Sequence, residues 1–157
     1  AQQASEDYAG RVPLLVCVLK GAVNTLTAFS QAMSIPLEMD FMSLSSYGSG
    51  TSTSGKVTVR QDLSTDVRGR DVLIVEDIVT TGGSIKEVVD VVNEAKGDIV
   101  GIGLLVDRSG GKADFGVPQE KVYPLLHLTV PTYKPEECPL CKEGVPITER
   151  GSHHLKK

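Results

Sequence analysis

The chain has 157 residues, of which 40% are hydrophobic and 23% charged, and this balance is typical of one globular domain. Its formal net charge of −4 argues against general binding to nucleic acids or to anionic membranes. No apolar run approaches the ~18 residues that a membrane-spanning helix needs. The first ten residues also lack the basic and apolar pattern of a signal peptide. We therefore expect a cytoplasmic protein.

Apolar runs and helical patterns alternate along the chain. Continuous apolar runs predict strands buried on both faces, as in a parallel sheet, and apolar residues at helical spacing predict helices. On this basis we predict strands at 12–19, 36–44, 56–60, 71–75, 99–106 and 121–130, and helices at 22–33 and 84–95. Strands that alternate with helices predict an α/β fold, a single domain with a mainly parallel central sheet and flanking helices.

Two polar segments interrupt this pattern. Residues 45–56, "SSYGSGTSTSGK", have too few apolar side chains to pack and predict a mobile loop. From residue 131 onward, four prolines predict a mostly extended or turning chain. We expect the domain to span 1–150 and the last residues, 151–157, to be disordered.

The segment 72–84, "VLIVEDIVTTGGS", places two acids after a buried strand and small polar residues before a helix. In open α/β sheets, ligands bind at the carboxyl ends of the strands, which is where Glu76 and Asp77 are expected. Helix N-termini bind phosphate, glycines permit close approach of the backbone, and hydroxyl groups add donors.

The two acids would repel a phosphate, but they suit the sugar hydroxyls or the hydrated Mg²⁺ beside it. The pattern therefore predicts a site for a phosphorylated sugar. The alternative is an ordinary strand–turn–helix with solvated acids. The segment is not a Walker loop, because no Gly-Lys-Ser/Thr follows the glycines.

This segment resembles the diphosphate-sugar motif of the type I phosphoribosyltransferases. The resemblance implies a phosphoribosyltransferase fold and transfer of ribose 5-phosphate from 5-phosphoribosyl 1-diphosphate (PRPP) to a nucleobase. It implies Mg²⁺, bound through the substrate and with Glu76 and Asp77 as candidate ligands. It also implies that these two acids contact the ribose hydroxyls. The residues implied to bind the 5-phosphate are Thr80, Thr81, Gly82, Gly83 and Ser84.

The two halves of the chain resemble different branches of that family. Residues 5–79, with "PLLVCVLKGA" and "PLEMDFMSLSSYGSGTSTSGKV", resemble a bacterial hypoxanthine phosphoribosyltransferase. Residues 71–150, with "VGIGLLVDRSGGKADFGVP" and "VPTYKPEECPLCKEGVPI", resemble an orotate phosphoribosyltransferase. We therefore predict a mosaic or chimera with a joint near 71–84.

Further site residues follow from these two resemblances. The purine branch implies that Leu19, Lys20 and Gly21 form the diphosphate-binding loop, often with a non-proline cis peptide, and that Lys20 faces the diphosphate. It also implies a loop, beginning with Ser45, Ser46 and Tyr47, that closes over the transition state. The orotate branch implies that Arg108 contacts orotate. The implied catalytic residues are Lys20, Ser46, Tyr47, Glu76 and Asp77.

Departures from both branches leave the base open. Thr80 stands where purine enzymes have an Asp proposed as general base, and Asp107 stands where they have a Lys that contacts the purine oxygen. The base-covering segments of both branches have no match here. We expect an enzyme with orotate as the favoured base and hypoxanthine or guanine as the alternative. A non-catalytic PRPP-binding module and a chimera built only to fold stay open, and the resemblance implies a homodimer.

Three cysteines and one histidine have both structural and functional interpretations. Cys17 lies in an apolar run, and we therefore predict that it is a small core residue. For Cys138 and Cys141 we favour a structural or incidental role over a zinc site, which would need two more ligands; His153 and His154 are the nearest candidates in sequence. His127 alternates with apolar residues, which favours a satisfied strand residue over a catalyst.

Overall fold

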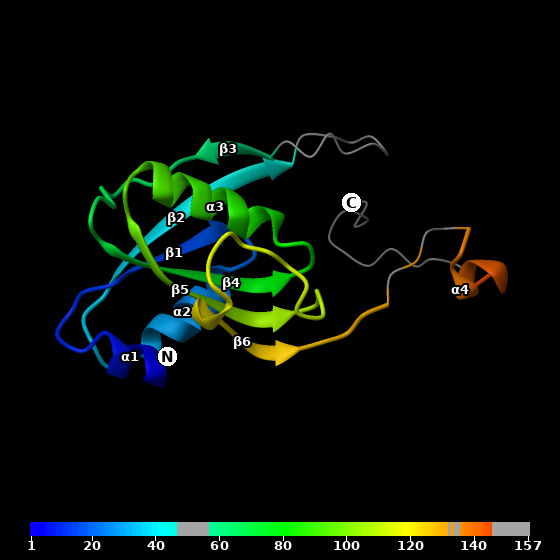
Figure 1. Ribbon diagram of the computed structural model, residues 1–157, viewed down its shortest axis with the longest axis horizontal. Coiled ribbons are helices and arrows are strands. Elements are labelled where there is room, and N and C mark those ends of the chain that lie inside the picture. The colour runs from blue at the N-terminus through cyan, green and yellow to red at the C-terminus, as the bar shows by residue number, and fades with distance from the viewer. Residues whose placement is uncertain (47–56, 132, 134–135, 146–157) are drawn as a thin grey trace, which may run out of the picture.

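The computed structural model describes residues 1–46, 57–131, 133 and 136–145. Within this part of the chain, six strands form one sheet in the order β3-β2-β1-β4-β5-β6 (Figure 1). The strands are β1 (Leu14–Leu19), β2 (Glu38–Ser46), β3 (Val57–Gln61), β4 (Asp71–Val79), β5 (Asp98–Asp107) and β6 (Val122–His127). The helices are α1 (Gln2–Asp7), α2 (Val23–Gln31), α3 (Gly83–Glu94) and α4 (Pro139–Lys142), with a 3₁₀ turn η1 (Gln119–Lys121). Five strands run parallel, and β3 pairs antiparallel with β2 at one edge.

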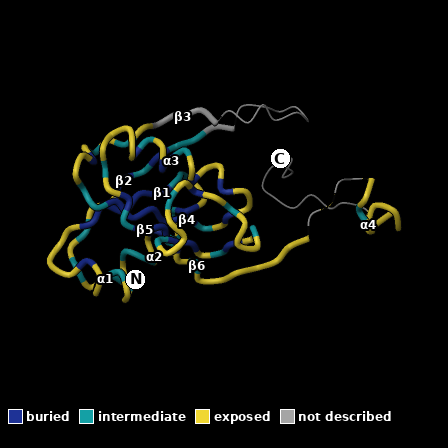
Figure 2. Tube along the Cα trace, in the orientation of Figure 1, coloured by how far each residue is buried: buried dark blue, intermediate teal, exposed yellow. Residues whose placement is uncertain are grey.

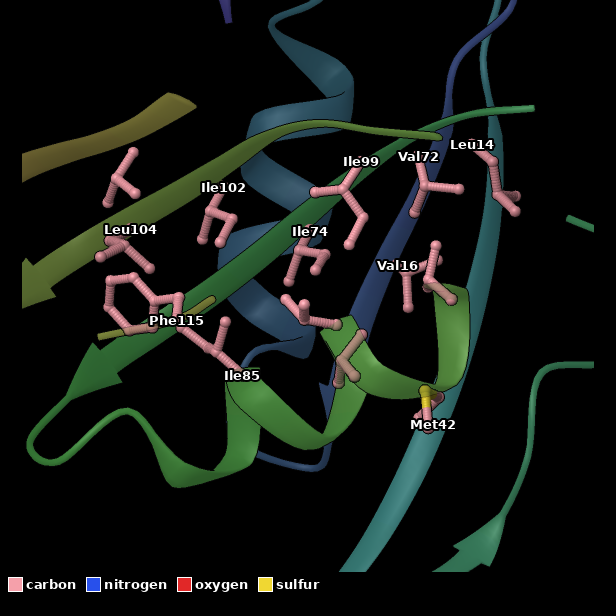
Figure 3. Packing of buried hydrophobic residues seen from close by; sticks show 14 of the residues in the cluster. Leu14, Val16, Met42, Val72, Ile74, Ile85, Ile99, Ile102, Leu104 and Phe115 are labelled. Atoms are coloured by element: carbon pink, nitrogen blue, oxygen red, sulfur yellow. The ribbon is translucent and has the colours of Figure 1, made fainter. Parts of the chain in front are cut away.

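Helices cover both faces of the sheet, α3 on one side and α1 and α2 on the other (Figure 1). The alternation of side chains along β4 explains this arrangement, because Val72 and Ile74 pack in the α3 layer while Leu73 and Val75 pack in the α2 layer. Figure 3 shows the first layer, in which Ile85 and Phe115 pack near Ile74 and neighbouring strand residues. The buried residues are concentrated along the central strands, whereas most of β6 is exposed (Figure 2).

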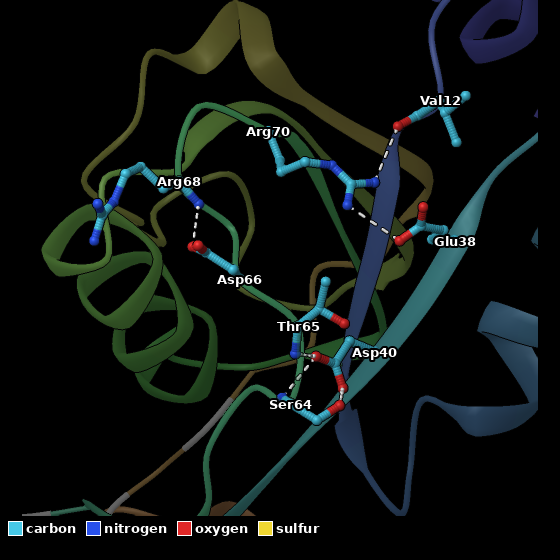
Figure 4. Close-up of polar contacts among 8 residues, drawn as sticks. All are labelled: Val12, Glu38, Asp40, Ser64, Thr65, Asp66, Arg68 and Arg70. Carbon is cyan, nitrogen blue, oxygen red and sulfur yellow. Dashed lines mark hydrogen bonds and ion pairs between the residues drawn. The ribbon is translucent and has the colours of Figure 1, made fainter.

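A buried carboxylate ties the segment after β3 to β2. Asp40 is 4% exposed, and its side-chain oxygens accept hydrogen bonds from the backbone N–H groups of Ser64 and Thr65, both at 2.8 Å (Figure 4). The Ser64 hydroxyl donates a third bond, at 2.9 Å. Burial raises the pKa of Asp40, but these hydrogen bonds and that from Phe41 N–H outweigh it and hold the pKa below its usual value. The ionised carboxylate therefore stabilises this turn.

The α/β fold class and the predicted central strands are confirmed, with one difference at the end of β4 and one helix that was not predicted. β4 does not stop at residue 75 but continues through the acid pair to Val79, because Ile78 and Val79 still pair with β5. The helix α1 was not predicted from the sequence. It is held against the sheet by its buried Ser5 and by the nearby Tyr8, whose hydroxyl donates to Val100 O at 3.1 Å.

The tail after residue 131 was predicted to be extended or turning, and the structure corrects this at α4. Pro139 occupies the first turn of this short helix, a position where proline costs no hydrogen bond. The predicted disordered segment 151–157 and most of the predicted loop 45–56 lie outside the described residues. Among the helices that the structure describes, none is long and apolar enough to cross a membrane.

Candidate functional site

The carboxyl ends of β1 and β4, which are neighbours in the sheet, enclose a hollow of about 210 Å³. The backbone after β1 forms one wall, and the end of β4 with the loop into α3 forms the other. The residues lining the hollow are Val18, Leu19, Gly21, Glu76, Asp77, Ile78, Val79, Thr80, Thr81, Gly82, Gly83, Ser84 and Ile85. All but four of these were predicted as site residues: Val18, Ile78, Val79 and Ile85 are apolar neighbours whose sequence gives no functional signal.

The two acids at the end of β4 have different surroundings. Glu76 is buried, and its Oε1 accepts a hydrogen bond from Asp77 N–H at 3.0 Å. Burial, followed by the interaction with the Asp77 carboxylate, raises the pKa of Glu76 to about 8, although the bond from Asp77 N–H lowers it. The protonated form of Glu76 is therefore favoured, and in that form the carboxyl group can donate to an oxygen of a ligand. Asp77 is only half-buried, and its Oδ1 accepts Ile78 N–H at 2.7 Å.

The loop after β1 approaches this acid pair closely. A Cβ added at Gly21 would lie 3.0 Å from Oδ2 of Asp77, so only glycine fits without movement of the carboxylate. The peptide bond between Leu19 and Lys20 is cis, as the resemblance implied. Leu19 and Gly21 line the hollow, whereas Lys20 is exposed and does not line it. The backbone of this loop, rather than the Lys20 side chain, therefore faces the acids.

The loop from β4 into α3 ends at an uncapped helix N-terminus. Gly82 is the N-cap residue with a φ of 84°, and no side chain of the described residues caps the helix. A Cβ at Gly82 would also lie 2.9 Å from Cε1 of Phe115. The free N–H groups of the first turn and the positive end of the helix dipole favour an anion at this end of the hollow. The hydroxyls of Thr81 and Ser84 lie in the same wall.

The ends of β5 and β6 lie beside this hollow but do not line it. The N–H of Arg108 donates to Val79 O at 2.8 Å, and the residue is exposed. Asp107 is buried, and its Oδ2 lies 3.3 Å from Nδ1 of His127. Burial raises the pKa of Asp107, but hydrogen bonds from Ser109 and the nearby His127 more than offset this and lower it.

His127 is the last residue of β6, which agrees with the predicted strand position. Its side chain is 61% exposed and pairs with Asp107. The sequence analysis missed this pair. Asp107 ends an apolar run, which was an available signal, whereas His127 lies between apolar residues and gave none. The Asp107–His127 register that joins them is a property of the sheet.

The remaining predicted residues lie away from the hollow or outside the described chain. Ser46 ends β2, with nothing described of its side chain, and Tyr47 lies outside the described residues, as do His153 and His154. Cys138 and Cys141 are free thiols. In the described ranges, no group of three or more potential metal ligands comes together. Cys17 is buried, as predicted, and burial followed by the charges of Glu76 and Asp77 raises the pKa of its thiol to about 11.

Comparison with known proteins matches the fold to one family. The family model "Phosphoribosyl transferase domain" matches residues 1–116. The orotate phosphoribosyltransferase of Caldanaerobacter subterraneus subsp. tengcongensis is 53% identical over 88 residues, 56% of this chain and 45% of that protein. That of Carboxydothermus hydrogenoformans is 59% identical over 81 residues, 52% of this chain and 41% of that protein. The chain thus spans less than half the length of these relatives.

Among solved structures, a hypoxanthine phosphoribosyltransferase from Staphylococcus aureus superposes with a TM-score of 0.69 and 29% identity, covering 80% of this chain and 67% of that chain. The relatives found by sequence are thus named for orotate, whereas this structural neighbour is named for hypoxanthine.

Proposed function

Because the chain belongs to the phosphoribosyl transferase domain family, we propose that it transfers ribose 5-phosphate from PRPP to a nucleobase and releases diphosphate. The observation that supports this most is the hollow itself. It joins a buried Glu76, whose pKa is raised, and its neighbour Asp77 to the uncapped N-terminus of α3, within one strand–loop–helix segment. That combination suits a ligand with hydroxyls at one end and a phosphate at the other.

Each wall has a role in this proposal. The 5-phosphate binds at the N–H groups of Gly83 and Ser84, with hydroxyls from the same loop. The ribose hydroxyls contact Glu76 and Asp77, one of which can donate and accept while the other accepts. The diphosphate meets the backbone of Leu19 and Gly21, and the exposed Lys20 side chain supplies a positive charge near its outer oxygens. Catalysis then depends on positioning and on stabilisation of charge in the transition state.

The residues present fit Mg²⁺ that is bound through the substrate. Mg²⁺ is commonly held by one or two carboxylates together with substrate oxygens and water. The half-buried Asp77 is the more accessible carboxylate for that role, and the buried Glu76 suits a hydroxyl of the ribose. When bound, the ion would neutralise charge on the diphosphate leaving group.

For the base we propose orotate. Three features support it: the curated relatives are orotate phosphoribosyltransferases, Thr80 replaces the Asp proposed as a purine base catalyst, and Arg108 follows the end of β5. A guanidinium can bind a carboxylate through two hydrogen bonds. Hypoxanthine or guanine is the second candidate, because the similar solved structure is a hypoxanthine phosphoribosyltransferase that covers 80% of this chain.

Other features of the proposal concern the whole protein. The resemblance of the two halves of the sequence to different branches supports a mosaic origin with a joint near 71–84. We also propose a cytoplasmic homodimer. Because the chain spans less than half of its sequence relatives, a module that binds PRPP without turnover is the competing proposal.

One assay separates these proposals. Diphosphate release is measured with Mg²⁺ and PRPP against orotate, hypoxanthine, guanine, xanthine, adenine and uracil, beside a calorimetric titration of PRPP. Diphosphate release with orotate alone supports the proposed reaction. Diphosphate release with hypoxanthine or guanine alone supports the second candidate instead. Saturable PRPP binding without release from any base identifies the non-catalytic module. No PRPP binding refutes the proposed function.

A further inference from the structure

Three neighbouring strands end in one row at the carboxyl edge of the sheet. Val79 at the end of β4 pairs with Asp107 of β5, and Asp107 pairs with His127 of β6. Adjacent strands lie about 4.8 Å apart, so the backbone of His127 is roughly 10 Å from the end of β4. The PRPP site follows directly on β4, and His127 therefore stands beside it, two strands away from the proposed sugar position.

The buried Asp107 determines how the imidazole is presented. Asp107 is 5% exposed, and its Oδ1 already accepts Ser109 N–H at 2.7 Å. Its Oδ2, 3.3 Å from Nδ1 of His127, can only accept, so Nδ1 carries the hydrogen. Nε2 lies across the ring from Nδ1 and makes no hydrogen bond to a described residue. The side chain is 61% exposed, which leaves Nε2 open to a ligand.

Asp107 also orders the segment that follows it. The Ser109 hydroxyl accepts the N–H groups of Lys112 and Ala113, both at 3.1 Å, and the turn continues to Phe115, against which Gly82 of the phosphate loop packs. The same carboxylate thus holds the histidine on one side and the start of this turn on the other. A surface ion pair contributes little to stability, so stability alone does not explain an imidazole in this place.

We propose that His127 is a base-recognition residue whose Nε2 hydrogen-bonds the polar edge of the nucleobase, with Asp107 as the positioning residue behind it. The inference rests on the proposed transferase function and deepens it. A neutral imidazole would accept a ring N–H through Nε2, and a protonated one would donate to a carbonyl or carboxylate oxygen. With the exposed Arg108 on the adjacent strand end, the arrangement suits an acidic pyrimidine that carries a carboxylate.

The test compares His127→Asn and His127→Gln with a control, Glu120→Gln. Asn places its amide near the Nδ1 position and cannot reach a ligand at Nε2, whereas the longer Gln can. Glu120 is exposed in η1, at the opposite end of β6. We expect His127→Asn to raise the KM for orotate roughly 10- to 100-fold, as for loss of a charge-assisted hydrogen bond, with a smaller change in kcat. His127→Gln should recover part of this loss, and Glu120→Gln should match the wild type.

The readouts distinguish this inference from the proposed function. The calorimetric Kd for PRPP should be the same in all four proteins. An orotate KM that is unchanged in His127→Asn overturns the inference while the transferase assignment stands. If PRPP binds but no base turns over, orotate is titrated into the PRPP-loaded proteins, and the same fold-change is expected in its Kd. Absence of orotate binding to the PRPP-loaded wild type, with PRPP bound, also overturns the inference. Absence of PRPP binding overturns both.

Discussion

Replacement of Gly82 by alanine should destabilise the protein and damage the phosphate end of the hollow. Gly82 has a φ of 84°, and an alanine there pays about 1–2 kcal/mol for the left-handed conformation. Its Cβ would also lie 2.9 Å from Cε1 of Phe115, a residue that is 4% exposed in the core. Overpacking of this kind costs about 1–3 kcal/mol. Together we expect Gly82→Ala to lower the free energy of unfolding by roughly 2–5 kcal/mol.

The neighbouring glycine supplies a matched control. Gly83 has no left-handed φ, and the nearest atom to its added Cβ is Thr81 Oγ1 at 3.9 Å, an ordinary contact. Gly83→Ala should therefore be neutral or stabilising by up to about 1 kcal/mol, because alanine favours the helix. Urea unfolding monitored by circular dichroism measures both free energies. Equal midpoints for Gly82→Ala and the wild type would refute the reasoning. When Gly82→Ala is made in the variant Phe115→Leu, the loss of unfolding free energy should be smaller, because the ring that the added Cβ would meet is absent.

The remaining predictions concern charged residues. Glu76→Gln should make the free energy of unfolding less dependent on pH. The pKa of Glu76 is raised to about 8 in the folded state, so the stability of the wild type falls as the pH rises from about 4.5 to 8. Urea denaturation at pH 5 and pH 8 should therefore show that the free energy of unfolding of the variant, relative to the wild type, is higher at pH 8 than at pH 5. Asp40→Ala should cost about 2–4 kcal/mol in urea unfolding, because it leaves the N–H groups of Ser64 and Thr65 without their acceptor; a cost below 1 kcal/mol would contradict this. The double variant Glu76→Gln/Asp77→Asn should weaken PRPP binding by about 2–4 kcal/mol in calorimetry, and unchanged affinity would exclude the ribose role. Arg108→Ala should abolish orotate turnover and leave the PRPP Kd unchanged; surviving turnover would show that Arg108 does not bind the base.

The wall of the hollow formed by the end of β4 and the loop into α3 was predictable because it is local in sequence. Strand, acid pair, small polar loop and helix follow one another within 72–84, and each step has its own physical reason. Buried strands give long apolar runs, and helix N-termini need small residues for close approach. Contacts between distant segments could not be read from a local pattern. An example is the close approach of Gly21, after β1, to Asp77, near the end of β4.

The end of β4 shows why boundaries are less predictable than elements. The apolar run stops at Val75, and the acids that follow predict an edge of the sheet. The strand nevertheless continues to Val79, because β5 is long enough to pair with it as far as Asp107. Backbone pairing with a neighbour, rather than the polarity of the strand's own side chains, sets where it ends. This extension also buries Glu76, and its raised pKa follows from that burial.

The pairing of Asp107 with His127 could not be inferred from local sequence, because the two residues come from separate strands. Asp107 and His127 are opposite one another only through the parallel register of β5 and β6, and a shift of one residue would pair Asp107 with an apolar neighbour instead. The sequence between them, which includes η1 and the turn to Phe115, sets that register by its length and packing. In the proposed function, the contiguous segment 72–84 binds the ribose 5-phosphate, and the separate loop after β1 binds the diphosphate. In the proposed function the base contacts the ends of β5 and β6, so we expect changes in the connection between these strands to alter the choice of base. At Phe115, which Gly82 approaches, such changes also reach the loop into α3.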